Sequence, residues 1–178
     1  MNYGENKMKH RIFAIALVAA LFAASASGAD LCAGKQQGSI SFYDVEVDRD
    51  KTLPPPVTRL VYSKPMFAVL CLLDAVGPQP PKGTKFRVVL WINGKQFGVF
   101  RPELSRPRTD IIIDVKEDFG DRMGYMIDAG THKLRLQGAT EKVTDKVAVT
   151  LDFKNDVAYF QRLRAAGYVA DGEITLVK

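Results

Sequence analysis

The stretch FRVVLWINGKQFGVF, residues 86–100, contains the strongest local structural signal in the chain. Two strand-like runs, 86–92 and 95–100, flank the pair Asn93-Gly94. Such a pair favours a type I′ turn, in which both central residues need a positive φ angle. The sequence therefore predicts a tight two-residue β-hairpin at this point.

Apolar and polar residues alternate with a period of two on both sides of this hairpin, which is typical of strands. Residues 66–73 are apolar on both faces and are therefore expected to form a central strand. The segment 159–166 is compatible with a strand or with a short helix. The other predicted strands are 39–47 (with a bulge near Asp44), 57–62, 109–115, 131–137, 147–153, 157–163 and 173–177, and the predicted loops are 48–56, 77–83, 101–108 and 116–124.

Strands at roughly ten-residue spacing, separated by turns rich in Pro and Gly and without a clear helical pattern, indicate an all-β fold. We expect a single antiparallel β-sandwich of the Ig-like or transthyretin-like kind. Its expected extent is 30–178, about 150 residues, which is the usual size of one domain.

The N-terminal residues have the organisation of a secretory signal peptide. A basic cluster at 9–11 precedes an apolar run at 12–24 and small residues at 25–29. Residues 1–29 are therefore predicted to be an N-terminal extension and a cleaved signal, with cleavage after Ala26 or Ala29. The expected location is the periplasm or the exterior of a bacterium.

The alternatives to a cleaved signal are a retained membrane anchor and a lipoprotein signal. About 13 apolar residues are fewer than the roughly 20 that a membrane-spanning helix needs, so no stable span is expected after cleavage. A lipoprotein signal would place a cysteine directly after a small residue, whereas Cys32 follows Asp30-Leu31.

Cys32 and Cys71 are the two cysteines of the chain. In an oxidising compartment, an even pair without metal-ligand spacing predicts a disulfide bond. Closing this loop of about 40 residues would stabilise the fold by roughly 4 kcal/mol. The alternative is two free thiols, with Cys71 acting as a small buried apolar side chain.

The formal charge of +5 includes residues that leave with the signal. Removing Lys7, Lys9, Arg11 and Glu5 takes away a net +2 and leaves +3. This modest excess does not support nucleic-acid binding, and export argues against it independently.

The residues that could carry chemistry are few, and no cofactor or metal is expected. His132 is the one histidine left after export, which excludes multi-histidine zinc sites, and no Gly-x-Ser-x-Gly sequence accompanies it. On an inward strand face, a histidine is most often a hydrogen-bonded core residue. The remaining enzymatic possibility is a carboxylate pair or calcium site in the charged loop, from Glu117, Asp118, Asp121 and Asp128, although Asp-x-Asp-x-Asp-Gly is missing.

Two sets of surface residues could bind a partner. Arg101, Arg106 and Arg108 could contact an acidic surface, or they could simply be solvated. Trp91 and Phe97 could form an aromatic binding platform, or they could belong to the core.

Residues 92–98, Ile-Asn-Gly-Lys-Gln-Phe-Gly, and residues 129–136, Ala-Gly-Thr-His-Lys-Leu-Arg-Leu, carry a resemblance to a known family. Together they resemble the pattern x-NGK-x-x-G followed by G-x-H-x-L-x-L of PEGA-type and related bacterial envelope domains of unknown function. The resemblance covers residues 86–177, apart from a long insertion at 101–126. It implies a small sandwich at the cell envelope without a known catalytic site.

Taken together, these observations predict an exported, non-catalytic protein that binds another envelope component, most simply a protein, through its loops. A second hypothesis is an inhibitor or immunity-type protein that blocks a periplasmic enzyme. A third is a carboxylate-dependent hydrolase.

Overall fold

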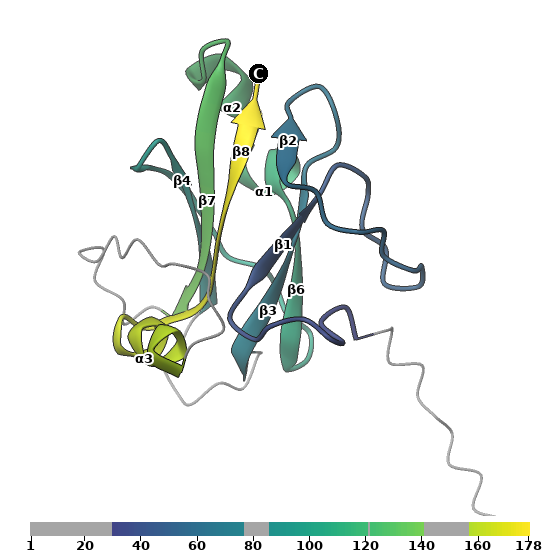
Figure 1. The fold of residues 1–178 in the computed structure, drawn as a ribbon, viewed down its shortest axis with the longest axis vertical. Coiled ribbons are helices and arrows are strands. Elements are labelled where there is room, and N and C mark those ends of the chain that lie inside the picture. Colours follow the sequence, from purple (N-terminus) through teal and green to yellow (C-terminus); the bar gives the residue numbers. More distant parts are fainter. Residues whose placement is uncertain (1–29, 77–85, 121, 141–156) are drawn as a thin grey trace, which may run out of the picture.

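The computed structural model describes residues 30–76, 86–120, 122–140 and 157–178. The fold is mostly β, as predicted, and its strands form two sheets (Figure 1). The strands are β1 (Ile40–Tyr43), β2 (Arg59–Val61), β3 (Phe67–Val76), β4 (Phe86–Ile92), β5 (Lys95–Phe100), β6 (Arg108–Asp114), β7 (Thr131–Thr140) and β8 (Tyr168–Val177). The helices are α1 (Val115–Phe119), α2 (Arg122–Met126) and α3 (Val157–Ala165).

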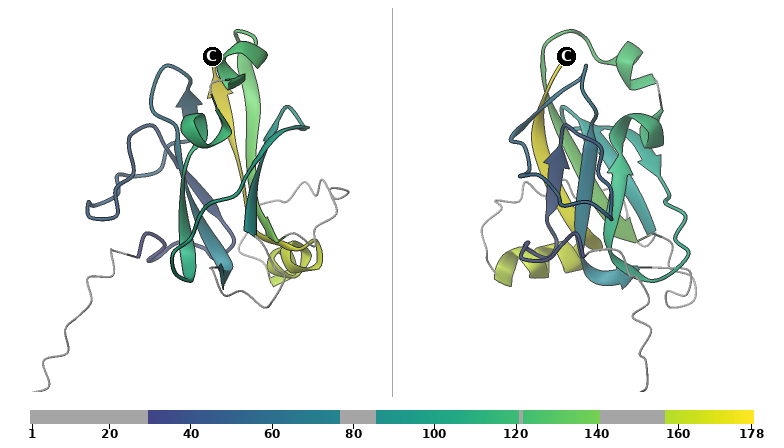
Figure 2. Two further views of the ribbon diagram at one scale, coloured as in Figure 1. Left: turned by 180° about the vertical axis from the view of Figure 1, so that it is seen from behind. Right: turned by 90° about the vertical axis from the view of Figure 1, so that its right-hand side faces the viewer.

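One sheet has the strand order β1-β3-β6, and the other has the order β2-β8-β7-β4-β5. The paired strands are antiparallel except at one edge, where β2 runs parallel to β8. The expectation of a purely antiparallel arrangement is therefore wrong at that edge. The two sheets lie as separate layers, with α2 and the C-terminus at one end of the molecule and α3 at the other (Figures 1 and 2).

A single apolar core lies between the sheets and takes side chains from both. The sequence of β3 is apolar on both faces because both faces of this strand are buried. Leu70 and Leu72 point into this core, whereas Val69 and Cys71 pack on the outer face against Leu31 of the N-terminal segment. The prediction of a central strand is confirmed, because β3 lies between β1 and β6.

The predicted β-hairpin is confirmed. Asn93 and Gly94 have φ angles of 51° and 77°, and Ile92 pairs with Lys95. The turn is also bound to β7: the Asn93 N–H donates to the Lys133 carbonyl at 2.8 Å, and the Lys133 N–H donates to Asn93 Oδ1 at 2.9 Å. The turn is thus fixed both by its own backbone and by the neighbouring strand.

The Sγ atoms of Cys32 and Cys71 lie at disulfide-bonding distance, with their Cα atoms 5.6 Å apart. This pairing, which the sequence predicted, holds the N-terminal segment on the outer face of β3. Leu31, Tyr43 and Val47 are buried there.

Two segments expected to lack helices contain them. The predicted loop 116–124 is largely helical, because Asp114 caps α1 by accepting hydrogen bonds from the N–H groups of Lys116 and Glu117. The strand expected at 157–163 is helix α3, in agreement with the alternative considered for 159–166. The chain turns after α3 at Gly167, whose φ is 76°.

The strand expected at 39–47 is shorter than predicted, because β1 ends at Tyr43. Asp44 leaves the sheet and its carboxylate pairs with Lys64 at 2.6 Å. The predicted strand 147–153, the predicted loop 77–83 and the N-terminal segment 1–29 lie outside the described residues. Within the described ranges, no helix has the length and apolar character needed to cross a membrane.

We predict that Gly94→Val destabilises the protein by about 1–3 kcal/mol. A Cβ at Gly94 would meet no atom within 4 Å, so the cost arises from forcing a β-branched residue to a positive φ. Denaturant unfolding checks this, with Lys95→Val as the matched control because it places the same side chain at an ordinary strand position. Equal midpoints for both variants would contradict the prediction.

The second prediction concerns the cysteines. Thiol titration of the unfolded, unreduced protein, exported and purified without reductant, should detect essentially no free thiol. After reduction the same assay should find both thiols of Cys32 and Cys71. Two reactive thiols before reduction would contradict the disulfide.

Candidate functional site

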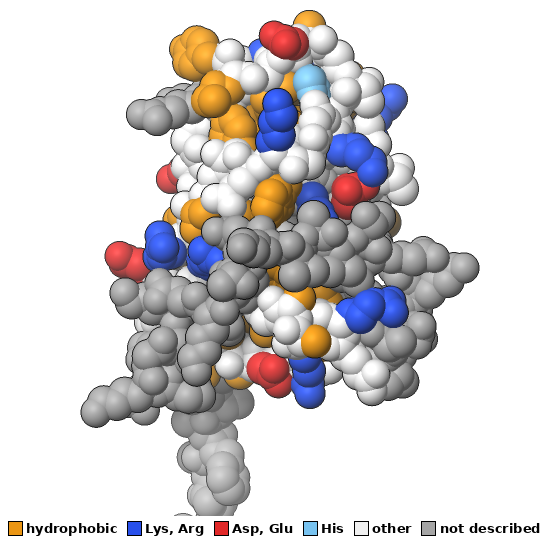
Figure 3. All heavy atoms as spheres, turned by 90° about the vertical axis from the view of Figure 1, so that its left-hand side faces the viewer, with side chains coloured by type: hydrophobic (Ala, Val, Ile, Leu, Met, Phe, Trp, Pro, Cys, Tyr) orange, Lys and Arg blue, Asp and Glu red, His pale blue; other side chains and the backbone are white. Residues whose placement is uncertain are grey.

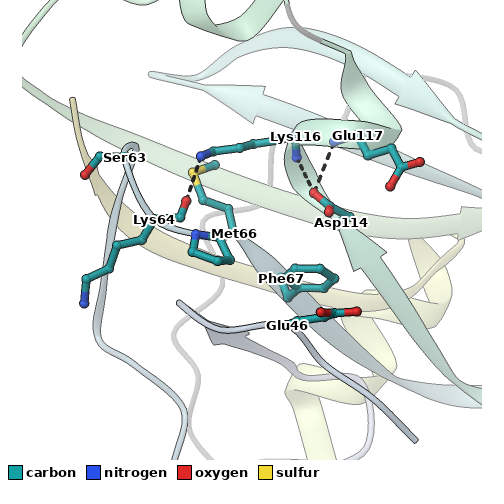
Figure 4. Close-up of a pocket in the computed structure, with 9 residues that line it drawn as sticks. Glu46, Ser63, Lys64, Met66, Phe67, Asp114, Lys116 and Glu117 are labelled. Atoms are coloured by element: carbon teal, nitrogen blue, oxygen red, sulfur yellow. Dashed lines mark hydrogen bonds between the residues drawn. The ribbon is translucent and has the colours of Figure 1, made fainter.

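The described residues form surface hollows, of which two are large enough to hold a ligand. The larger, of about 750 Å³, is called the α1 hollow and lies between the start of β3 and helix α1 (Figure 4). Its lining residues are Glu46, Ser63, Lys64, Pro65, Met66, Phe67, Asp114, Lys116 and Glu117.

The main polar groups of the α1 hollow already serve the fold. Lys116 Nζ donates to the Lys64 carbonyl at 2.7 Å (Figure 4). Lys64 Nζ in turn pairs with the carboxylate of Asp44. Asp114 is occupied as the cap of α1. The two lysines and this carboxylate are therefore not available to a ligand without loss of structural contacts.

The second hollow, of about 350 Å³, is called the tip hollow. It lies where the β4–β5 turn, the end of α2 and the start of β7 come together. Its lining residues are Ile92, Asn93, Lys95, Gln96, Phe97, Met126, Ile127, Asp128 and His132.

His132 organises the wall of the tip hollow through two hydrogen bonds. Its Nε2 lies 2.9 Å from the Asp128 carbonyl, which can only accept, so Nε2 carries the proton. Its Nδ1 lies 3.0 Å from Asn93 Nδ2 and therefore accepts from that amide. The half-buried imidazole thus has the structural role expected for a hydrogen-bonded histidine.

Helix α2 presents two apolar side chains to solvent beside this hollow. Met123 and Ile127 lie on the inner side of the segment and are buried in the core. The residues between them must then face outward, and Tyr125 and Met126 are 91% and 69% exposed. Figure 3 shows hydrophobic side chains at the upper end of the molecule in this view, near the pale-blue histidine.

The α2 segment is also held by polar contacts. Lys178 Nζ donates to the Gly124 and Ile127 carbonyls at 2.5 Å each, which satisfies carbonyl groups at the end of the helix. The ammonium groups of Lys116 and Lys178 lie 4.9 and 5.7 Å from the centre of the Tyr62 ring. The outward side chains of α2 are therefore carried by a well-anchored segment.

The arginines proposed from the sequence lie at the opposite end of β6 from α1 and α2, because their loop precedes this strand. Arg108 is the first residue of β6, is mostly buried, and lies 3.6 Å from the Asp110 carboxylate, which also pairs with Arg49. Arg101 and Arg106 are exposed. Arg108 thus belongs to a structural ion pair, which leaves two of the three arginines exposed on the loop.

The acidic residues singled out in the sequence are divided among different positions. Glu117 and Asp118 lie on α1, Asp128 lies after α2, and Asp121 is outside the described residues. No group of three or more His, Cys, Asp or Glu side chains suited to a metal ion occurs in the described part of the chain.

The carboxyl of Asp118 has a raised pKa. Burial raises its pKa from 3.8 to about 6, and repulsion from Asp114 and Glu117 adds to the effect. Its Oδ2 accepts the Asp114 N–H at 3.0 Å, which opposes the shift. Asp118 is not among the residues that line the α1 hollow or the second hollow described above.

Trp91 and Phe97 do not form a common platform. Leu90 and Ile92 point into the core, so Trp91 between them faces the outer side of the five-stranded sheet. Phe97 packs against the core and lines the tip hollow.

The outer side of the same sheet contains a buried ion pair. Asp171 is fully buried and accepts from Arg135 Nε at 2.9 Å and Nη2 at 2.5 Å. Burial raises the pKa of the Asp171 carboxyl, and Arg135 partly offsets this. Removing one partner of such a pair typically costs about 3–5 kcal/mol, so this pair is a structural feature.

Tyr125 and Met126 were not among the predicted site residues, although the sequence contains a signal for their exposure. Asp114 followed by Glu117 has the spacing of a helix cap with an acidic third residue. Met123 and Ile127 have the four-residue spacing of one helical face. Together they would have predicted a short helical segment with Tyr125 and Met126 facing solvent.

Comparison of the chain with protein families, with curated proteins and with solved structures finds no match.

Asp118 yields a prediction with a defined sign. Because the pKa of Asp118 is raised in the folded state, its contribution to stability is most favourable below its unfolded-state pKa near 4. This contribution is lost as the pH rises through about 6. Asp118→Asn removes this penalty and keeps an oxygen that can accept the Asp114 N–H. After discounting for solvent screening, we expect the variant to be more stable than wild type at pH 7.5 by on the order of 1 kcal/mol.

Thermal or denaturant unfolding from pH 3.5 to 7.5 measures this difference. The gap between the two proteins should close below pH 4. Glu103→Gln, at an exposed position on the loop before β6, is the control because its charge is not among those that act on Asp118. A difference between Asp118→Asn and wild type that does not change with pH would contradict the assignment.

Proposed function

We propose that this chain is an exported, non-catalytic β-sandwich protein, of the Ig-like or transthyretin-like kind, that binds another envelope protein through one end of the fold. The binding region, called the tip surface, consists of Tyr125, Met126 and the tip hollow. Export is supported by the signal-like organisation of residues 1–29 and by the pairing of Cys32 with Cys71. The proposed compartment is the periplasm or the exterior of a bacterium.

The observation that carries this proposal is the exposure of Tyr125 and Met126 on an anchored segment. Tyr and Met are enriched in protein interfaces, and large exposed apolar side chains close together mark interaction sites. Because Met123 and Ile127 fix α2 to the core, little conformational entropy is lost when a partner covers the outward side chains. Met126 also adjoins a hollow, which supplies a concave surface next to a projecting one.

The other hypotheses have weaker support. Steering of an acidic partner by the loop of Arg101, Arg106 and Arg108 is one of these hypotheses, and Arg108 is engaged with Asp110. An inhibitor or immunity-type protein would be a special case of the same proposal, with an enzyme as the partner. A hydrolase would need carboxylates converging on a hollow, whereas Asp118 lines neither one.

The proposal predicts that Tyr125→Ser with Met126→Ser abolishes partner binding while leaving the fold intact. We would place a photo-crosslinking amino acid at the exposed Ala129, irradiate living cells, and compare the adducts of the otherwise wild-type protein and the double variant. A specific adduct with wild type should fall at least tenfold with the variant, since losing two buried anchors typically costs more than about 2 kcal/mol. The unfolding midpoint should change little.

Val45→Ser is the matched control, because Val45 is an exposed apolar residue, 42% accessible, on a loop outside the tip surface. Its adduct should equal that of wild type. Absence of any adduct from the tip surface, or an adduct unchanged in the double variant, would contradict the proposed function.

A further inference from the structure

We propose that the tip hollow receives one bulky apolar side chain from an extended segment of the partner protein, with an acidic residue on one side of that side chain and a basic residue on the other. This inference rests on the proposed function and specifies the chemistry of the occupant. It follows from the walls, the hydrogen bonding and the rim charges of the hollow.

Part of the wall is apolar. Ile92, Phe97 and Ile127 pack against the common core, and the exposed side chain of Met126 also lines the hollow. A volume of about 350 Å³ is at the lower end of the range for small-molecule sites, which fits one large side chain with its adjacent backbone. The flexible, polarizable Met126 can adapt to an aliphatic or an aromatic side chain.

Two polar side chains of the wall, His132 and Asn93, are already hydrogen-bonded within the protein. The imidazole of His132 donates to the Asp128 carbonyl and accepts from Asn93, and Asn93 Oδ1 accepts from Lys133. A polar occupant would find these groups already satisfied and would lose its own hydrogen bonds to water. The hollow therefore favours an apolar side chain.

The rim carries one positive group on β5 and one negative group in the segment between α2 and β7. Lys95 follows the β4–β5 turn, and Asp128 precedes β7. Both are exposed, and neither side chain forms an ion pair with a described residue. A segment with opposite charges on either side of its apolar residue would complement both groups, which adds specificity more than affinity.

Concave shape also distinguishes this occupant from a membrane surface. Lipid binding relies on apolar side chains that project into the headgroup region, and it gains from a uniformly basic surround. The tip surface contains a hollow, and its rim includes the carboxylate of Asp128. A protein segment therefore fits this geometry better than an anionic bilayer.

The probes are the acetylated, amidated tripeptides Asp-Phe-Lys and Lys-Phe-Asp, because the direction of the segment along the rim is open to either arrangement. Titration into ¹⁵N-labelled and methyl-labelled protein should shift the amide signals of Asn93 and Gln96 and the methyl signal of Met126. One charged tripeptide should bind with a dissociation constant of about 1 mM, a value ordinary for so small a ligand. Asp-Ala-Lys, which lacks the apolar group, should bind roughly tenfold more weakly or not at all.

A charge exchange tests the rim. Lys95→Glu combined with Asp128→Lys should reverse the preference between the two charged tripeptides, by about two- to fivefold in each direction. Both positions are exposed, and an unchanged unfolding midpoint verifies that the variant is folded. A preference that stays the same in the exchanged protein would overturn the role of the rim charges.

The remaining outcomes separate this inference from the proposed function. If no tripeptide shifts signals in the hollow while the Tyr125→Ser/Met126→Ser variant still loses its adduct, the inference is wrong and the proposed function stands. If neither experiment gives its expected result, both fail. If phosphatidylglycerol vesicles, and not the tripeptides, shift the same signals, the tip surface contacts a membrane and the inference is overturned.

Discussion

The two sheets depend on a short junction at Gly38 and Ser39, where one segment of backbone bonds to both. The Gly38 N–H donates to the Cys71 carbonyl at 2.6 Å, and the Cys71 N–H donates to the Ser39 carbonyl at 2.9 Å. On the other side, the Asp171 N–H donates to the Gly38 carbonyl at 2.9 Å. The neighbouring Gly172 permits this approach, because a Cβ there would lie 2.5 Å from the Cβ of Ile40. The disulfide to Cys71 and the buried carboxylate of Asp171 therefore converge on the same junction.

With the sheets joined at this junction, the opposite edges β5 and β6 need cover, since exposed strand edges promote association. Helix α1 supplies it: Phe119 lies 3.1 Å from the Cβ position of Gly98 on β5 and packs edge-to-face on Phe100, with ring centres 6.2 Å apart. On β6, the carboxylate of Asp118 accepts one backbone N–H on the free side of the strand. Asp118 is thus partly desolvated at the position where its carboxylate satisfies a backbone N–H of the strand edge.

The sequence was sufficient for features set by short-range rules. The Asn93-Gly94 turn follows from the φ angles that these residues tolerate, and the central place of β3 follows from its two apolar faces. The parallel pairing of β2 with β8 could not be predicted, because it joins residues more than a hundred positions apart with no local signal at either. The tip hollow could not be predicted for the same reason, since it combines residues 92–97 with residues 126–132.

The arrangement of α2 separates the contacts that hold the fold from the surface available for binding. Met123 and Ile127 face the core, and Lys178 satisfies carbonyl groups of the same segment. Tyr125 and Met126 contribute little to burial, so the fold gains little from keeping them apolar. Large apolar side chains in such positions raise the risk of non-specific association without a compensating gain in stability. A partner that covers them offsets this liability, and the anchored backbone then lowers the entropy lost on binding.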